Sequence, residues 1–348
     1  MNFSKEIINW YWTNKRDLPW RNTTDPYIIW LSEIILQQTR VEQGTPYFFR
    51  FAENYPTVFD FASASENEIL NHWQGLGYYS RGRNMHHTAK VIVDEYNGVF
   101  PIAYDELIKL KGIGEYTAAA IASFASNEAK AVVDGNVYRL FARYFGIFTP
   151  INSGQGKREF SDIANKLIDK KQPGTYNQAI MEFGSLQCRP KNPLCGTCPL
   201  RLDCVAFNNN SISALPVKLK SQKSRNRYFN YIVAISANSI LINKRGPNDI
   251  WENLHDFPLI ETPNLIDGRE LIHNTQFIDN FGKNVYIERC YVPVKHVLSH
   301  QNIYAQFFVI NQFSDEFLHK SSWQYVPLSD LVHLAQPKLI FEFLKSFL

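Results

Sequence analysis

Four of the five cysteines in this 348-residue chain lie close together, in the loop 188–204. Their spacing is C-x6-C-x2-C-x5-C, and prolines and glycines interrupt the stretch, so we expect a loop that wraps its thiolates around one centre. Four thiolates suit either a tetrahedral zinc ion or a 4Fe-4S cluster, and spacing alone leaves both open. Since every ligand position would be a thiolate, we expect a structural role. The four residues are Cys188, Cys195, Cys198 and Cys204.

Two carboxyl groups have settings that suit acid–base chemistry. Glu33 lies on a predicted helix that starts at Asp25 and Pro26, and its neighbours at helical spacing are largely apolar, so burial should raise its pKa. Asp134 precedes GNVYRLFARYF and can cap that helix, where backbone N–H groups should lower its pKa and keep it ionised. Opposed pKa shifts in two carboxyls are used to hydrolyse glycosidic bonds. Glu33 is the predicted general acid, and a glutamate that only pairs with a base is the alternative.

A two-glycine turn in LKGIGEYTAAA can hold an anion. Gly112 and Gly114 stand between an apolar helix end and a new helix, whose first N–H groups are free to bind phosphate. A simple connection between two helices is the alternative interpretation.

The elements that must position these residues change in kind along the chain. Residues 1–210 show helical spacing, residues 211–228 read as an exposed basic linker, and residues 229–348 contain β runs and a closing helix in PKLIFEFLKSFL. The expected fold is an all-α domain followed by an α+β domain. The fifth cysteine, Cys290, is expected to be a buried small apolar residue. The linker's basic residues are Lys218, Lys220, Lys223, Arg225 and Arg227.

Composition and charge indicate whether this chain binds a polyanion, spans a membrane or is secreted. The formal net charge is +3, which is compatible with binding a polyanion but does not by itself argue for it. No apolar run approaches the roughly 20 residues of a membrane helix, and the first residues do not resemble a signal peptide. The sequence therefore predicts a cytoplasmic protein without membrane contact.

The order of these motifs resembles a known superfamily. The glycine turn, then VDGNV, then the cysteine loop is similar to the helix-hairpin-helix DNA glycosylases related to endonuclease III, with the hairpin at about 105–125. Within that superfamily, SEIILQQTRVEQ, WQGLGYYSRGRN, GIGEYTAAA and VDGNV resemble the MutY-type adenine DNA glycosylases. The resemblance implies base excision repair: hydrolysis of the N-glycosidic bond of adenine opposite 8-oxoguanine or guanine. It also implies duplex DNA as partner, a 4Fe-4S cluster rather than zinc, and a nucleoid-associated monomer.

The resemblance also assigns roles to residues. Glu33 would protonate adenine, Asp134 would stabilise or transiently bond to the sugar, and Asn136 and Tyr116 would position them. Relatives that also cut the strand have a lysine nucleophile where this chain has Tyr116, which predicts simple base removal by water. The alternatives are an endonuclease III-like lyase acting on oxidised pyrimidines and a non-catalytic sensor of DNA damage.

Further residues would surround the extruded base and its partner. By resemblance, the adenine pocket contains Arg16, Trp20, Arg21 and Glu182. The residues expected to insert into DNA beside the partner base are Gln38, Thr39, Leu76 and Tyr78. Loop packing is the alternative explanation for an aromatic residue such as Tyr78.

The C-terminal half resembles a Nudix-like domain that recognises 8-oxoguanine, through INKR, IWENLHDFP and KHVLSHQ. Ser299 and His300 match the recognition loop, while Leu298 stands where that family usually has an aromatic residue. A working Nudix hydrolase needs a helix with clustered glutamates for magnesium, and DGRELIHNTQF supplies only Glu270. We therefore expect this domain to bind rather than to hydrolyse nucleotides.

Overall fold

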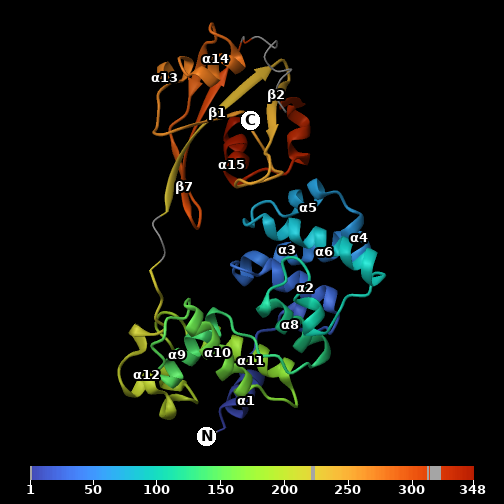
Figure 1. The fold of residues 1–348 in the computed structure, drawn as a ribbon, viewed down its shortest axis with the longest axis vertical. Helices are drawn as coiled ribbons and strands as arrows, with labels where there is room; N and C mark the ends of the chain where they lie inside the picture. Colours follow the sequence, from blue (N-terminus) through green and yellow to red (C-terminus); the bar gives the residue numbers. More distant parts are fainter. Residues whose placement is uncertain (1, 221–223, 312, 314–322) are drawn as a thin grey trace. The chain divides into compact units, whose positions relative to one another are not determined.

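The computed structural model describes residues 2–220, 224–311, 313 and 323–348. The chain divides into two compact units, drawn in Figure 1. The first, called here the helical unit, comprises Met1–Ser63 and Asn84–Lys220. The second, the sheet unit, comprises Ala64–Arg83 and Ser221–Leu348. No helix in the described residues is long and apolar enough to cross a membrane.

The helical unit consists of short helices around a shared apolar core, as the helical spacing predicts. The core includes residues from the first helix, from the helix after Asp134 and from the helix that precedes the cysteine loop. The α-helices are α1 Phe3–Asn14, α2 Pro26–Ile35, α3 Val41–Asn54, α4 Val58–Ser63, α6 Ser80–Tyr96, α7 Tyr104–Leu107, α8 Glu115–Ser126, α9 Gly135–Phe145, α10 Gly154–Leu167, α11 Pro173–Leu186 and α12 Val205–Asn208. The 3-10 turns are η1 Pro19–Arg21, η2 Cys195–Thr197, η3 Arg201–Asp203 and η4 Ile212–Ala214.

Local sequence explains where α2 begins and ends. The Asp25 side chain accepts a hydrogen bond from Tyr27 N at 2.9 Å, and Pro26 occupies the first turn, where its missing N–H costs nothing. The helix ends at Ile35, earlier than the spacing indicates, and Gln38 adopts a left-handed conformation with φ 56° in the turn before α3. Gln38 and the residue after it therefore project from a turn rather than from the helix.

Helix packing brings distant parts of the sequence to one place. Helix α2 packs against α8, α8 against α11, and α11 against α9. Gly184 lets α11 approach α9 closely, because a Cβ there would lie 2.7 Å from Asn136 Cβ and 2.9 Å from Asn136 O. The carboxyls on α2 and before α9 can then face one another.

The sheet unit is built on a mixed sheet whose central strands, β1 and β7, are parallel. The strands of the described residues are β1 Arg225–Ser236, β2 Ser239–Lys244, β3 His255–Asp256, β4 Leu259–Thr262, β5 Ile287–Cys290, β6 Val294–Val297, β7 Gln301–Ile310 and β8 Trp323–Pro327. The helices are α5 Glu66–His72, α13 Gly268–Ile272, α14 Thr275–Phe281, η6 Leu328–His333 and α15 Lys338–Phe347. The path through the sheet is β3-β2-β1-β7-β5, with β4 on β1, β6 on β7 and β8 on β2.

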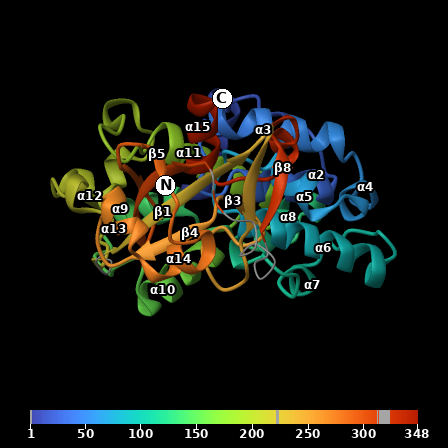
Figure 2. The same cartoon turned by 90° about the horizontal axis from the view of Figure 1, so that it is seen from above.

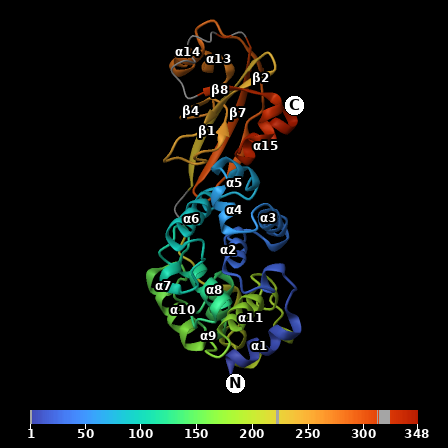
Figure 3. The same cartoon turned by 90° about the vertical axis from the view of Figure 1, so that its right-hand side faces the viewer.

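Helices cover both faces of this sheet. Alternate residues of β1 point to opposite sides: Tyr231 packs in the core under α15, and Ile232 packs with α13 and α14. Figures 2 and 3 show α15 on one side of the sheet and α13 with α14 on the other. The predicted α+β class is confirmed.

The segment 64–83 belongs to the sheet unit through side-chain contacts of α5. Asn67 Nδ2 donates to His333 O and Asn71 Nδ2 donates to Val332 O, both at 2.9 Å. Sequence periodicity gives no hint of this grouping, because both donors are surface residues of an ordinary amphipathic helix.

Two predictions about the C-terminal half are wrong. The expected linker ends too late, because β1 already begins at Arg225, and Arg227 is a buried ion-pair residue with 8% exposure. The stretch 221–223, including Lys223, lies outside the described residues. Cys290 is exposed on β5, since among the described residues this strand pairs with β7 alone and packs little on that face.

Candidate active site

A cavity of about 840 Å³ opens in the helical unit, where α2, α8, α9 and α11 meet. It collects most of the residues that the sequence predicts for catalysis and for base binding. The predicted residues that line it are Arg16, Trp20, Arg21, Glu33, Gln38, Thr39, Gly114, Tyr116, Asp134, Asn136 and Glu182. Also lining it, and missed by sequence reasoning, are Phe124, Gln178, Met181 and Ser185. Only the packing of α8 against α11 reveals these four.

Glu33, the predicted general acid, lines this cavity. Its side chain is half-buried, and burial raises its pKa from 4.5 to about 7, against a hydrogen bond from Tyr116 that lowers it and with the charge of Asp134 raising it further. The positive charge of Arg21 has a smaller, opposing effect on the pKa. At neutral pH a substantial fraction of Glu33 is therefore protonated, as the apolar setting on α2 predicts.

Asp134 caps α9 and is held by several donors. Its oxygens accept hydrogen bonds from Asn136 N at 2.9 Å, Val137 N at 2.8 Å and Asn136 Nδ2 at 2.7 Å. The predicted direction of its pKa shift is wrong: burial outweighs these hydrogen bonds and raises its pKa. Sequence reasoning counted the helix start and could not count the desolvation. Because every one of these partners donates, the ionised form still fits the site best.

Asn136 connects this carboxylate to a buried arginine. Arg139 Nη2 donates to Asn136 Oδ1 at 2.9 Å and to Gly184 O at 2.6 Å, while its Nε donates to Cys188 O at 2.8 Å. One side chain thus ties the cavity wall to the start of the cysteine loop.

Glu182 lies in the same cavity wall but in the opposite electrostatic state. Arg16 donates to both of its oxygens, at 2.9 and 2.6 Å, and Arg21 donates at 2.8 Å. Burial disfavours the charge, but the two arginines outweigh it and hold the pKa of Glu182 at about 2. Trp20 is buried beside them and packs edge-on against Phe48. This set forms a rigid, charged side of the cavity.

The glycine turn has the geometry expected of an anion site. Gly112 has φ +82°, and a Cβ there would lie 2.7 Å from Asn84 Cβ, so only glycine fits. Gly114 caps α8 with extended backbone and open space around it. The first helix of the hairpin is shorter than expected, since α7 ends at Leu107. The free N–H groups at the start of α8 remain available to a phosphate.

The cysteine loop encloses a small apolar cavity of about 30 Å³, lined by Cys188, Cys195, Cys198 and Cys204. Burial and the charges of the neighbouring thiolates together raise the pKa of Cys198 to about 11. Arg143 Nη1 lies 3.5 Å from Cys188 Sγ. In the described residues, no three His, Cys, Asp or Glu side chains are arranged as a finished metal site. Clustered thiols that resist ionisation together are nevertheless the donor set that a cationic centre stabilises.

A second cavity, of about 680 Å³, lies within the sheet unit and is called here the recognition cavity. Tyr78 and Ser299 meet there, with their hydroxyl oxygens 2.7 Å apart. Ser299 and His300 are exposed at the turn between β6 and β7, and Leu298 also lines the cavity. Leu76 lines it too but is buried, with 7% exposure. The two predicted recognition segments, 221 residues apart at Tyr78 and Ser299, thus share one cavity.

Glu270 has a local structural role. It closes a capping box with Asp267 at the start of α13, through hydrogen bonds of 2.9 and 3.0 Å. Its carboxylate is thereby used in the helix cap.

Comparison with known proteins agrees with this arrangement. The HhH-GPD superfamily of base excision DNA repair proteins matches residues 31–167, and the NUDIX domain family matches residues 230–346. A thermostable thymine-DNA glycosylase superposes with a TM-score of 0.56 at 28% identity, covering 60% of this chain and 95% of its own. An endonuclease III bound to DNA superposes with a TM-score of 0.52 at 24% identity, which supports the fold alone.

Curated relatives extend over nearly the whole chain. The adenine DNA glycosylase of Buchnera aphidicola subsp. Acyrthosiphon pisum is 30% identical over 99% of this chain and 97% of its own length. That of Buchnera aphidicola subsp. Schizaphis graminum is 36% identical over 75% of each. The human adenine DNA glycosylase is 40% identical over 59% of this chain and 39% of its own. With its cavity of paired carboxyls, its hairpin and its second domain, this chain belongs to the adenine DNA glycosylases, the enzymes that remove adenine from duplex DNA.

Proposed function

We propose that this enzyme hydrolyses the N-glycosidic bond of adenine opposite 8-oxoguanine, with Glu33 as general acid and Asp134 as the stabilising carboxylate. The observation that carries the chemistry is the asymmetry of the two groups in one cavity. Glu33 has a pKa of about 7, and Asp134 is surrounded by donors that fit its ionised form. A protonated acid facing a carboxylate that is held by hydrogen-bond donors is the pattern found where glycosidic bonds are cleaved.

The proposed reaction is acid-assisted hydrolysis by water. Glu33 gives its proton to a ring nitrogen of adenine, and the C1′–N9 bond breaks with its electron pair leaving on the base. Asp134 lies across the cavity to stabilise the positive charge that develops on the sugar. A water molecule then adds its oxygen to C1′ and returns a proton to Glu33. Tyr116 and Asn136 hold the two carboxyls in place.

Substituting Glu33→Gln tests this assignment, since glutamine keeps the shape but has no acidic proton. Single-turnover adenine release should fall by about 100- to 10,000-fold while binding to mispaired duplex is retained. A variant that still releases adenine at nearly the wild-type rate would exclude Glu33 as the acid. A non-catalytic sensor would have no release to lose.

We also propose that the enzyme leaves the strand intact. Tyr116 offers a hydroxyl where a lyase needs an amine, and no lysine lines the helical-unit cavity among the described residues. A Schiff base with the sugar is then not accessible. Borohydride added during turnover on adenine-containing duplex should trap no covalent complex, whereas near-stoichiometric trapping would contradict hydrolysis by water.

Recognition of 8-oxoguanine is assigned to the recognition cavity. Its support is the contact between Tyr78 and Ser299, both polar residues at one opening lined by apolar side chains. Replacing Ser299→Ala should reduce the preference for adenine opposite 8-oxoguanine over adenine opposite guanine, with little change on the second substrate. An unaltered preference would remove Ser299 from the recognition site.

The cysteine loop is assigned to one 4Fe-4S cluster, held by Cys188, Cys195, Cys198 and Cys204, in line with the cavity they share. When bound, such a cluster would tie the loop together without entering the reaction. Arg143 would support it by donating to Arg189 O at 2.7 Å and Pro190 O at 3.0 Å. Purified protein should be brown, with about four iron atoms per chain. One zinc ion and no visible absorbance would refute the assignment.

A further inference from the structure

An unassigned aromatic side chain stands in the recognition cavity. Trp251, in the segment between β2 and β3, lines this cavity together with Tyr78, Leu298 and Ser299. Neither its position in IWENLHDFP nor the general resemblance gives it a role. It is half-buried, so part of the indole can meet a ligand.

The backbone at Trp251 is strained. Its φ of 62° lies in the left-handed region, which a bulky aromatic residue rarely adopts. Such a conformation persists only where the surroundings enforce it. Here Leu254 N donates to Trp251 O at 3.0 Å, Asn253 N donates to Arg245 O at 3.0 Å, and Arg83 Nη1 donates to Glu252 O at 2.8 Å. The turn is therefore held from both sides.

Neighbouring rings orient the indole, and among the described residues the rings that contact it meet it edge-to-face rather than stacked in parallel. Its centroid lies 5.8 Å from that of His296 and 6.2 Å from that of Phe229, with interplanar angles of 64° and 79°. Both contacts are edge-to-face, which fixes the tilt of the ring. The Arg245 guanidinium lies 5.9 Å from the ring centroid.

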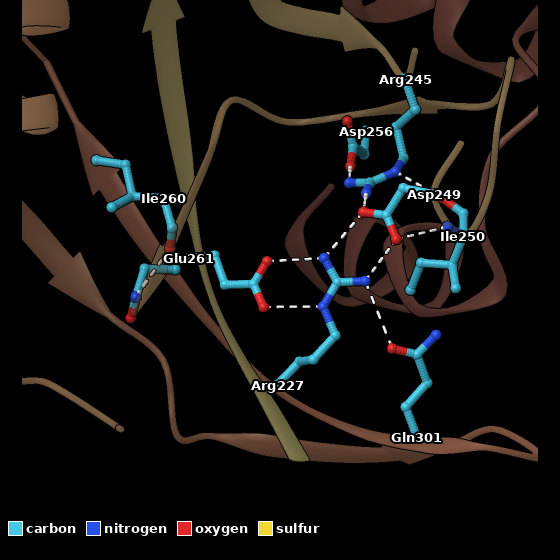
Figure 4. Close-up of polar contacts among 9 residues, drawn as sticks. Arg227, Arg245, Asp249, Ile250, Asp256, Ile260, Glu261 and Gln301 are labelled. Carbon is cyan, nitrogen blue, oxygen red and sulfur yellow. Dashed lines mark hydrogen bonds and ion pairs between the residues drawn. The ribbon is translucent and has the colours of Figure 1, made fainter. Parts of the chain in front are cut away.

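A network of ion pairs around the buried Arg227 and Arg245 lies directly before this turn, and Figure 4 shows its members. Asp249, two residues before Trp251, accepts from Arg227 at 2.5 and 2.8 Å and from Arg245 at 2.7 Å. Its own oxygen accepts from Ile250 N at 2.7 Å, and Arg245 Nε donates to Ile250 O at 2.9 Å.

The two arginines are themselves anchored in the sheet. Arg245 pairs with the fully buried Asp256 at 2.8 Å, and Arg227 pairs with Glu261 through bonds of 2.7 and 2.8 Å. The cavity wall before Trp251 is thus fixed to β1, β2, β3 and β4 rather than being a loose loop.

We propose that Trp251 is a specificity-determining residue, the aromatic surface on which the oxidised purine stacks, and that Asp249 is the positioning residue that holds it there. The inference rests on the proposed function, in which this cavity receives 8-oxoguanine. Leu298 offers no π-face on its side of the cavity, and Trp251 supplies one from another wall. Stacking on an aromatic side chain is a strong and general way to hold an unstacked base.

The test uses the full chain with Trp251→Ala and Trp251→Phe, and Tyr286→Ala as the matched control. Tyr286 is an aromatic residue of the same unit, 75% exposed and outside the recognition cavity. Single-turnover rates, with enzyme in excess over the DNA but below saturation, are compared for adenine opposite 8-oxoguanine and adenine opposite guanine. Trp251→Ala should lower the preference for the oxidised partner by about 10-fold, which is the loss of one stack. Trp251→Phe should keep most of the preference, and Tyr286→Ala all of it.

The outcomes separate this inference from the function on which it rests. A wild-type enzyme without preference for the oxidised partner would overturn the proposed function itself. A wild-type preference that survives Trp251→Ala, or that Trp251→Phe loses to the same extent, would overturn the stacking role alone.

Asp249→Asn gives a second, independent measurement should Trp251→Ala fold poorly. It keeps the size of the side chain and removes its charge, so the preference should fall by less than in Trp251→Ala. In the double variant, Asp249→Asn should cause no further loss of preference, because both changes act on one contact. Additive losses in the double variant would contradict the positioning role.

Discussion

Carboxyl groups have different partners in the two units of this enzyme. In the helical-unit cavity, Glu33 has Tyr116 as a hydrogen-bond partner, and burial raises its pKa to about 7. In the sheet unit, Asp256 is fully buried but pairs with Arg245, and Asp249 pairs with two arginines. The first arrangement suits the proton donor proposed above, and the second holds the wall of the recognition cavity in place.

Glu182 shows that the difference is local and not a property of the unit. It lies in the same cavity as Glu33, yet two arginines hold its pKa at about 2. A carboxyl without a paired cation is thus suited to proton transfer, whereas a carboxylate paired with arginine is suited to a rigid, structural role.

The largest effect is expected from breaking a pair in the sheet unit. Arg245→Met leaves Asp256 charged and without its cation, which should lower the free energy of unfolding by about 3–5 kcal/mol. The loss of stability should be smaller at pH 5 than at pH 8. Folding raises the pKa of Asp256, so its protonated form stabilises the folded state at low pH, and this stabilisation is lost as the pH rises through the folded-state pKa. Denaturant unfolding at both pH values measures this.

The exposed Arg289 of β5 provides the control for that substitution, and Arg289→Met should leave the unfolding transition in place. Adenine release by folded Arg245→Met on guanine mispairs should remain close to wild type. A large loss of that rate without loss of stability would contradict the separation of roles between the two units.

The next effect concerns the charged member of the catalytic pair. Asp134→Asn removes the negative charge that faces the sugar, and single-turnover release should fall by about 100- to 1,000-fold. It also weakens the cap of α9, at a cost of about 1 kcal/mol in stability.

Ser153→Ala separates these two consequences. Ser153 caps α10 by accepting from Gly156 N at 2.9 Å, away from the cavity. This variant should show the same small loss of stability with an unchanged rate. If adenine release by Ser153→Ala fell as much as that by Asp134→Asn, lost stability rather than lost charge would explain the slower release in both variants.

A smaller effect is expected at Tyr116. Tyr116→Phe removes the hydroxyl that lowers the pKa of Glu33 and that also donates to Met181 Sδ at 3.2 Å, and release at pH 7 should change by about tenfold or less. Because that hydroxyl lowers the pKa of Glu33, its loss should move the alkaline limb of the pH–rate profile to higher pH. Tyr138→Phe, on α9 with its ring against Phe160, is the control and should leave the limb in place. A limb that moved to lower pH would contradict the proposed contact.

Sequence alone predicts the parts of this account that depend on local patterns. The cap at Asp25, the cap at Asp134, the glycine turn and the raised pKa of Glu33 all follow from neighbours within one helical turn. The change from helical spacing to β runs predicts the two domains, and the resemblance adds the partners of Glu33 in the cavity.

What sequence cannot supply is long-range burial. It gives the wrong sign for the pKa shift of Asp134, because the number of atoms around that carboxyl depends on how α9 packs against α11. It places Arg227 in a solvated linker, because a basic run in the sequence does not reveal that Arg227 forms ion pairs with Asp249 and Glu261 in the folded protein. The role proposed for Trp251 likewise depends on a turn that only the folded network defines.

The central claim is that burial makes Glu33 a proton donor at neutral pH, and the pH dependence of single-turnover adenine release tests it most directly. The rate should be highest below pH 7 and fall about tenfold per pH unit above an apparent pKa of about 7, as Glu33 loses its proton. The fall should be absent from the residual activity of Glu33→Gln. A wild-type rate that stays constant from pH 6 to about pH 9 would contradict the account.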